Sequence, residues 1–210
     1  MPPVLTVRAF AEMLELPLYE QVRILEEQKY PRRKPTPYRV VYYQPALAAL
    51  RDFYTSGGQL QVLQQAINAI QGSTMTDAKK KNNIRVIQSF QQSSQVRRQL
   101  AIRPRRRTEV GFHGVTLKYI PDLVGHDGVR EKHVFYNVRQ APVTSGIVKT
   151  TLEITQLVLI RGGVKVALND VEFVDLANRG RVHRITRTRK RTLKRASQNA
   201  RAIGHLWPRI

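Results

Sequence analysis

The residues best suited to a chemical role by type and spacing lie in one stretch, KYIPDLVGHDGVREKHVFYNVR, at positions 118–139. Its β-branched and aromatic residues and its Asp-Gly pair predict two strands joined by a tight turn. Asp122 follows a proline near the end of the first strand. Asn137 and Arg139 share one face of the second strand because side chains alternate along a strand. Because hard divalent cations prefer carboxylate oxygens, Asp122 raises the question of whether this hairpin holds a metal ion.

The elements expected around this hairpin alternate in type. Apolar spacing and turn residues predict a helix from near Thr76, strands within 98–104, 114–125 and 131–139, a helix over 144–163 and a strand pair within 164–185. The expected order from residue 75 is therefore α-β-β-β-α-β-β. This order places the chain in the α+β (α/β) class.

The first 72 residues are predicted to be mainly helical, because apolar residues recur at helical spacing over 7–14, 17–31, 44–58 and 59–72. The last segment reads as a basic amphipathic helix with a thin apolar stripe at Leu193, Ala196, Ala200 and Ile203. We therefore expect a helical N-terminal domain at 1–72, an α/β domain at 73–185 and a basic C-terminal helix at 186–210.

The basic residues are clustered along the chain. Residues 31–39, 79–107 and 179–210 hold 25 of the 36 Lys and Arg residues and none of the 15 Asp and Glu residues. Such segregation is costly by self-repulsion unless a polyanion is bound. A solvated surface, acidic lipid and an acidic protein partner are alternatives. Nucleic acid is favoured because arginine dominates these blocks and its planar fork suits phosphate oxygens.

The residues expected to contact nucleic acid are the cations of these blocks. They are Arg32, Arg33, Lys34, Lys79, Lys80, Lys81, Arg97, Arg98, Arg103, Arg105, Arg106, Arg107, Arg187, Arg189, Lys190, Arg191, Lys194, Arg195 and Arg201.

Several other classes of site are disfavoured. The chain has no cysteine, which excludes disulfides, thiolate zinc sites and thiol nucleophiles. His113, His126 and His133 lack the spacing of helical zinc ligands, and no glycine-rich phosphate loop is present. The N-terminal sequence lacks a signal-peptide pattern, and the apolar runs are shorter than the ~20 residues that span a bilayer. We expect a cytoplasmic protein without a membrane partner.

With this order of elements, the chain from residue 75 resembles the PD-(D/E)XK, or restriction-endonuclease-like, superfamily, and its RecB-like branch in particular. In that family an Asp after Pro and an acid on the next strand hold Mg²⁺, while a Lys two residues later assists the attacking water. The resemblance implies that Asp122 matches the first acid. Gln156 matches a glutamine that often completes the site from the following helix.

The resemblance fails at the other two positions. Asn137 and Arg139 stand where the second acid and the lysine belong. Asn is a neutral ligand, Mg²⁺ prefers anionic oxygens, and Arg cannot lose a proton at working pH. The site is therefore expected to be degenerate, with catalysis disfavoured and no cofactor. Mg²⁺ would bind, through Asp122, only if the nuclease activity survives.

The favoured hypothesis is a nucleic-acid-binding protein that contacts phosphates more than base edges. By the resemblance it acts as a subunit of a DNA- or RNA-processing machine of repair, restriction, CRISPR or transposon type, with other proteins of a nucleoprotein complex as partners. Two alternatives stay open. One is an active Mg²⁺-dependent endo- or exonuclease that recruits Glu109, Glu131 or Glu153. The other is a structural RNA-binding protein of a ribonucleoprotein.

Overall fold

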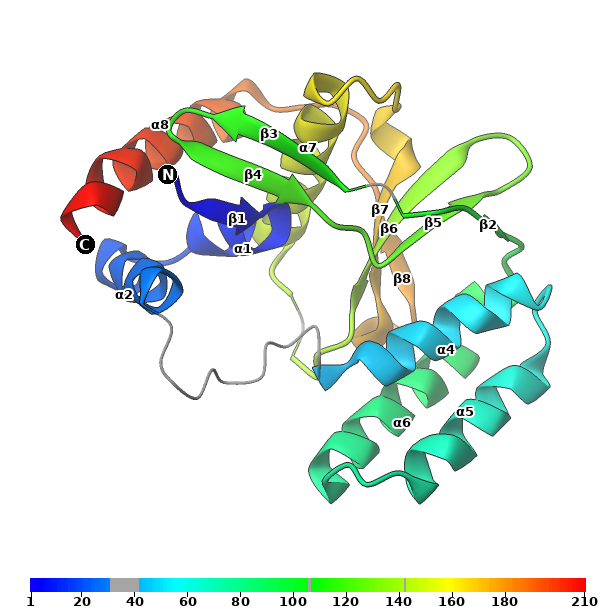
Figure 1. Cartoon of the computed structure of the whole chain (residues 1–210). Helices are drawn as coiled ribbons and strands as arrows, with labels where there is room; N and C mark the ends of the chain where they lie inside the picture. The colour runs from blue at the N-terminus through cyan, green and yellow to red at the C-terminus, as the bar shows by residue number, and fades with distance from the viewer. Residues whose placement is uncertain (31–41, 106, 142) are drawn as a thin grey trace.

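The computed structural model describes residues 1–30, 42–105, 107–141 and 143–210 (Figure 1). The helices are α1 (Val7–Met13), α2 (Leu18–Lys29), α4 (Gln44–Thr55), α5 (Leu60–Gly72), α6 (Asp77–Gln91), α7 (Ser145–Arg161) and α8 (Lys190–Leu206). The strands are β1 (Val4–Thr6), β2 (Ala101–Ile102), β3 (Thr108–Phe112), β4 (Val115–Tyr119), β5 (Leu123–His126), β6 (Glu131–Asn137), β7 (Val171–Asp175) and β8 (Arg181–His183).

The strands form two sheets. The larger has the order β2-β5-β6-β7-β8, in which β6 and β7 are parallel and the other pairs are antiparallel. Because a parallel pair needs a crossover, α7 connects these two strands. The smaller sheet has the order β1-β4-β3, with β1 parallel to β4. These elements confirm the α+β class, while the restriction-endonuclease-like topology stays a prediction.

The expected hairpin is present, but its first strand is divided. β4 ends at Tyr119 in the small sheet and β5 begins at Leu123 in the large one, with a Pro121-Asp122 step between them. Proline has no N–H to donate to a ladder, so the pairing is interrupted there. Asp122 therefore lies where the two sheets meet. At the other end of the hairpin, the backbone N–H groups of Arg130 and Val129 hold the pKa of Asp127 at about 2.

Hydrophobic side chains cover both faces of the larger sheet. Phe135 and Phe173 point into a core shared with α1, α7 and α8. Their strand neighbours Val134, Tyr136 and Val174 point the other way, into a core shared with α4, α5 and α6. The three helices α4–α6 lie together below the strands (Figure 1). Burial on both faces explains why β7 reads as a continuous buried run instead of an alternating one.

Residues 1–72 contribute to both hydrophobic cores. Helices α1 and α2 belong to the core shared with α7 and α8, which we call the first core, and α4 and α5 belong to the core shared with α6, which we call the second core. The domain limits 1–72, 73–185 and 186–210 stay predictions. The apolar stripe of the last helix is confirmed, since Ala196, Ala200 and Ile203 are buried in the first core and Leu193 packs against it.

Two strands were absent from the expected order. β1 has three residues, and β3 (TEVGF) follows an arginine-rich run and contains a glycine and a glutamate. Between α6 and α7 the described residues form five strands, where three were expected, because β3 is added and the segment 114–125 is split. In the described ranges, no helix is both long and apolar enough to cross a membrane.

Candidate nucleic-acid interface and degenerate metal site

Asp122 lies at the start of β5 with its carboxylate against the next strand. Its Oδ2 accepts a hydrogen bond from the backbone N–H of Tyr136 at 2.8 Å, and its own N–H donates to Val134 O at 3.1 Å. Burial raises the pKa of Asp122, while Arg8, the Tyr136 N–H, Arg105 and Arg51 act in the opposite direction. The carboxylate is thus set among cations.

A guanidinium from α1 lies over the same part of the sheet. Arg8 Nη1 donates to Tyr136 O at 3.0 Å, and its guanidinium carbon is 5.5 Å from the ring centre of Phe173. Its Nε is 3.4 Å from Glu12 Oε1. Phe173 is the register partner of Phe135, on the face that also holds Asn137. The guanidinium of Arg8, a fixed positive charge, therefore lies near Asp122, where the metal ion was expected.

Asn137 is committed to hydrogen bonds within the protein. Its Nδ2 donates to Asp175 Oδ1 at 2.8 Å and to Ala141 O at 3.3 Å, and its Oδ1 accepts from Arg139 N at 3.2 Å. Asp175 ends β7 directly opposite Asn137 and is buried. The amide thus joins the ends of two parallel strands, and its oxygen is already engaged.

The other two expected site residues have partners elsewhere. Arg139 Nη2 binds both carboxylate oxygens of Glu12, at 2.7 and 3.0 Å. Gln156 Oε1 accepts a hydrogen bond from Thr188 at 3.0 Å, which connects α7 to the segment before α8. The structure therefore brings Asp122 and Asn137 to one sheet face. It assigns Arg139 to α1 and Gln156 to the approach to α8.

These residues do not fit a divalent metal. In the part of the chain that the structure describes, no group of three or more histidine and acidic side chains could hold one. Mg²⁺ requires anionic oxygens, whereas the groups that act on Asp122 are arginines and the Asn137 oxygen is engaged. Two of the candidate substitute acids form ion pairs, Glu109 with Lys118 at 2.5 Å and Glu153 with Arg189 at 2.8 Å, and the carboxylate of Glu131 lies 3.5 Å from the His133 ring.

Three of the expected nucleic-acid contacts also have internal acidic partners, while their contact with nucleic acid stays a prediction. Arg98 binds both oxygens of the fully buried Glu172, at 2.5 and 3.1 Å. Arg189 binds the buried Glu153, and Arg195 binds Glu15 at 2.9 Å. The guanidinium groups of these arginines therefore already form ion pairs within the fold. Arg32, Arg33, Lys34 and Arg106 lie outside the described residues.

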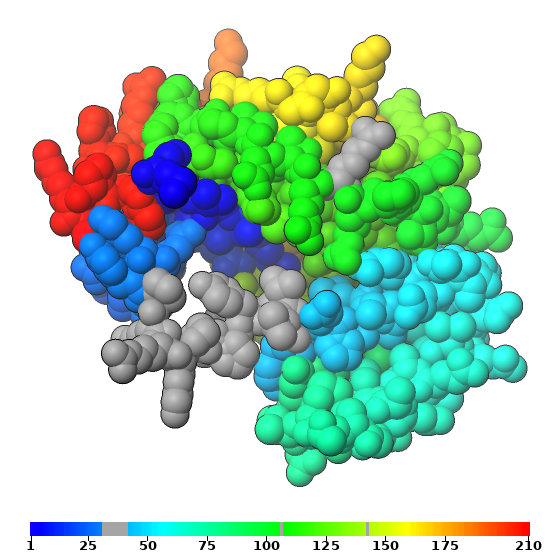
Figure 2. Space-filling model, viewed as in Figure 1, coloured from blue at the N-terminus to red at the C-terminus, as the bar shows by residue number. Residues whose placement is uncertain are grey.

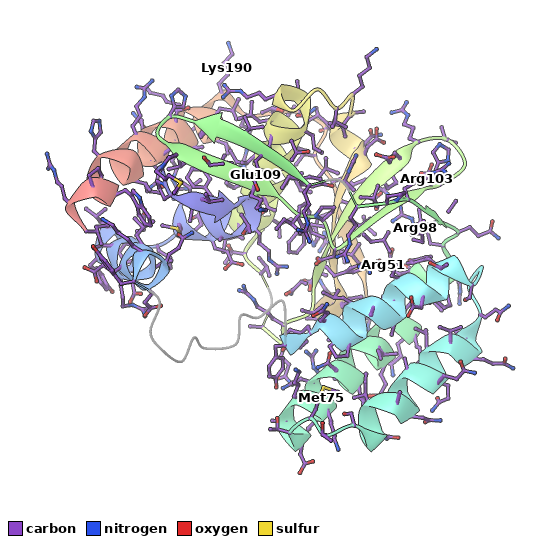
Figure 3. The ribbon with its side chains drawn as sticks, viewed as in Figure 1. Arg51, Met75, Arg98, Arg103, Glu109 and Lys190 are labelled. Atoms are coloured by element: carbon purple, nitrogen blue, oxygen red, sulfur yellow. The ribbon has the colours of Figure 1, made fainter. Side chains whose placement is uncertain are left out.

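Helix α8 presents the clearest cationic surface. Its buried residues are Thr192, Ala196, Ala200 and Ile203. On the opposite side the exposed residues Lys190, Arg191, Lys194 and Arg201 form what we call the α8 basic face. None of these four forms an ion pair with an acid in the described residues. Side chains of α8 project outward in Figure 2, and Lys190 points away from the body of the molecule in Figure 3.

The remaining cations lie on separate parts of the molecule. Lys79, Lys80 and Lys81 are in the first turns of α6, at the tip of the three-helix unit and away from α8 (Figure 1). The exposed cations around β2 and beside α8 are Arg97, Arg103, Arg105, Arg107 and Arg187. Lys79, Lys80 and Lys81 and the α8 basic face are therefore separate surfaces.

Neither a scan against protein-family models nor a search of curated proteins found a match.

The site also contains Arg8, Glu12 and Asp175, which the sequence did not reveal as site residues. A signal existed for Asp175, because it ends the strand after the crossover helix, where the carboxyl ends of parallel strands meet. Arg8 and Glu12 gave no such signal, since they reach the site from a helix more than 100 residues away.

Proposed function

We propose that this protein binds nucleic acid through backbone phosphates, with the α8 basic face as its main contact, and that its Asp122 hairpin does not hydrolyse the bound strand. The supporting observation is the division of α8 into a buried apolar side and an exposed cationic side. Insertion into lipid or a protein groove needs an apolar face. On α8 that face is already packed against the first core, so cations are what the helix offers to a partner.

The size and chemistry of this face suit a nucleic-acid backbone. A helix of 17 residues is about 25 Å long, and base pairs repeat every 3.4 Å, so α8 matches about seven base pairs. Lys and Arg contacts to phosphate position a protein without reading sequence. The resemblance and the engaged polar groups around Asp122 support a role as a non-hydrolytic subunit of a DNA- or RNA-processing machine.

The test is a salt titration with matched charge variants. We expect Lys190→Gln, Lys194→Gln and Arg201→Gln together to make the slope of log K against log salt shallower by about 3 for duplex DNA, because each lost phosphate contact removes about 0.9. The control neutralises Lys149, Lys165 and Arg130, which lie outside the basic blocks. Equal losses in both triple variants, or a parent slope shallower than about −2, would contradict the proposal.

Charge variants are preferable to truncation before residue 186. Truncation would remove Ala196, Ala200 and Ile203 from the first core and so confuse unfolding with loss of contact. In the same assays we expect no cleavage of DNA or RNA with Mg²⁺ or Mn²⁺. Metal-dependent cleavage that disappears in Asp122→Ala would establish the nuclease alternative instead.

A further inference from the structure

Three guanidinium groups from distant segments converge on Asp122. Arg51 Nη2, from α4, donates to the backbone oxygen of Asp122 at 3.3 Å. Arg8 reaches the neighbouring Tyr136 O from α1, and the charge of Arg105, from the segment after β2, also acts on the carboxylate. Figure 3 shows Arg51 on the side of α4 that faces the strands. The junction of the two sheets is thus a cationic cluster.

The cluster has more positive charge than its own acids balance. Arg8 and Arg139 both contact Glu12, and Asp122 is an acid on which the charges of Arg51 and Arg105 act. Among the described residues, neither Arg51 nor Arg105 forms an ion pair with an acidic side chain. Arg105 is exposed, and Arg51 is half-buried with one guanidinium nitrogen engaged by a backbone oxygen. Both therefore retain N–H groups for a ligand.

An anion would relieve a repulsion built into this arrangement. Partial burial lowers the pKa of Arg105, the charges of Arg51 and Arg107 lower it further, and the charge of Asp122 acts in the opposite direction. Like-charged groups held together by the fold are stabilised when an anion binds between them. A guanidinium donates in a planar fork that matches the tetrahedral oxygens of phosphate. The ligand class that fits best is therefore a phosphodiester.

We propose that Arg51 and Arg105 form a metal-independent subsite for one backbone phosphate, at the place where an active hairpin of the resembling family would hold its metal ion. This inference rests on the proposed nucleic-acid binding. In it, Arg8 and Glu12 position the cluster, and Arg51 and Arg105 touch the ligand.

The first test compares two double variants that each remove two positive charges. Arg51→Gln with Arg105→Gln should weaken binding of a 30-nucleotide strand at least about tenfold at 0.1 M salt, since each charge-assisted hydrogen bond contributes substantially. The loss should be independent of Mg²⁺ and of base sequence. The control, Lys149→Gln with Lys165→Gln, removes the same charge from exposed sites outside the basic blocks. Arg51→Lys in place of Arg51→Gln should restore part of the affinity, because lysine keeps the positive charge.

The second test uses the absence of cysteine. A single cysteine at Ile120, 36% exposed beside the Pro-Asp step, can carry an iron–EDTA probe that cuts nearby nucleic acid. A cysteine at Val129, 79% exposed at the far end of the same hairpin, is the control. We expect cuts from position 120 and few from position 129.

The outcomes separate the two proposals. If the parent binds no nucleic acid, both fail. If it binds, the subsite inference alone fails when the test and control double variants weaken binding equally, or when the probe at 120 cuts no more than the probe at 129.

Discussion

At the scale of single residues, the burial of Asp122 changes its pKa and so makes the stability of the fold depend on pH. Burial is the largest influence on its pKa and raises it. A raised carboxyl pKa means that the protonated form is favoured by folding. The corresponding stability is fully present below the unfolded pKa of about 3.9 and is lost as pH rises through the folded value.

We therefore expect Asp122→Asn to be at least as stable as the parent at pH 7, with an advantage that disappears towards pH 4. The amide oxygen can still accept from the Tyr136 N–H. Urea unfolding at both pH values measures the difference. A variant that is less stable at pH 7 than at pH 4, relative to the parent, would show that Arg8, Arg105 and Arg51 outweigh burial.

Glu172 is a second residue with a distinct consequence. Its side chain is fully buried and binds Arg98 and Arg184, so it joins three segments of chain. Glu172→Gln leaves two guanidinium groups without their anion and should cost about 3 kcal/mol of unfolding free energy, because breaking a buried pair strands the partner charge. Glu109→Gln breaks the exposed pair with Lys118 and should cost less than about 1 kcal/mol. Equal costs would mean that Glu172 contributes no more than a surface pair.

The sequence predicted the features of the site that depend on neighbouring residues of one strand, but not the partners that come from distant segments. Alternation along one strand correctly placed Asn137 on the face opposite Tyr136, and the Pro-Asp step placed Asp122 near the strand end. The partners were not predictable. Arg139 binds Glu12, 127 residues away, and no spacing rule in one sequence encodes such a pairing. Internal use of Arg98, Arg189 and Arg195 was hidden for the same reason.

At the scale of elements, α8 is held by a contact between two glycines. A Cβ added at Gly204 would lie 3.1 Å from the Cα of Gly114 and 3.2 Å from its carbonyl oxygen. Gly114 itself has φ of +90°, in the turn between β3 and β4. The helix therefore seats directly on the backbone of this turn.

We expect Gly204→Ala to displace α8 and to be about 1–3 kcal/mol less stable than Gly72→Ala, since overpacking against backbone is costly. Gly72 ends α5 with open space around its Cβ position, so alanine there removes only the helical penalty of glycine. Thermal or urea unfolding of both variants gives the comparison. Equal stabilities would show that α8 does not depend on this close approach.

Long, regular elements were predictable and short or interrupted ones were not. The helices over 60–72 and 145–161 appear where apolar spacing placed them. β1 pairs with β4 across more than 100 residues, and three residues contain too little pattern to reveal a strand. Pro121 is a local signal for the division of 114–125, but which sheet each half joins depends on tertiary pairing that the sequence pattern does not show.

At the scale of the whole molecule, the positive charge is spread over separate surfaces. The α8 basic face borders the first core, and Lys79, Lys80 and Lys81 lie at the tip of the α4–α6 unit, which packs on the other face of the larger sheet. One short stretch of nucleic acid cannot cover both. Charge that appears as one net value in the sequence therefore predicts binding without predicting its footprint.

This separation predicts that duplex length decides which cations matter. An 8-base-pair duplex, about 27 Å long, matches α8 and should lose most of its salt dependence when Lys190, Lys194 and Arg201 are neutralised. Neutralising Lys79, Lys80 and Lys81 should leave the short duplex unaffected. With a 30-base-pair duplex, the lysine variant should also flatten the slope of log K against log salt, by up to about 3, because the strand can now reach the tip of the helical unit. Loss of affinity for the short duplex in the lysine variant would contradict this arrangement and would place the first contact on α6.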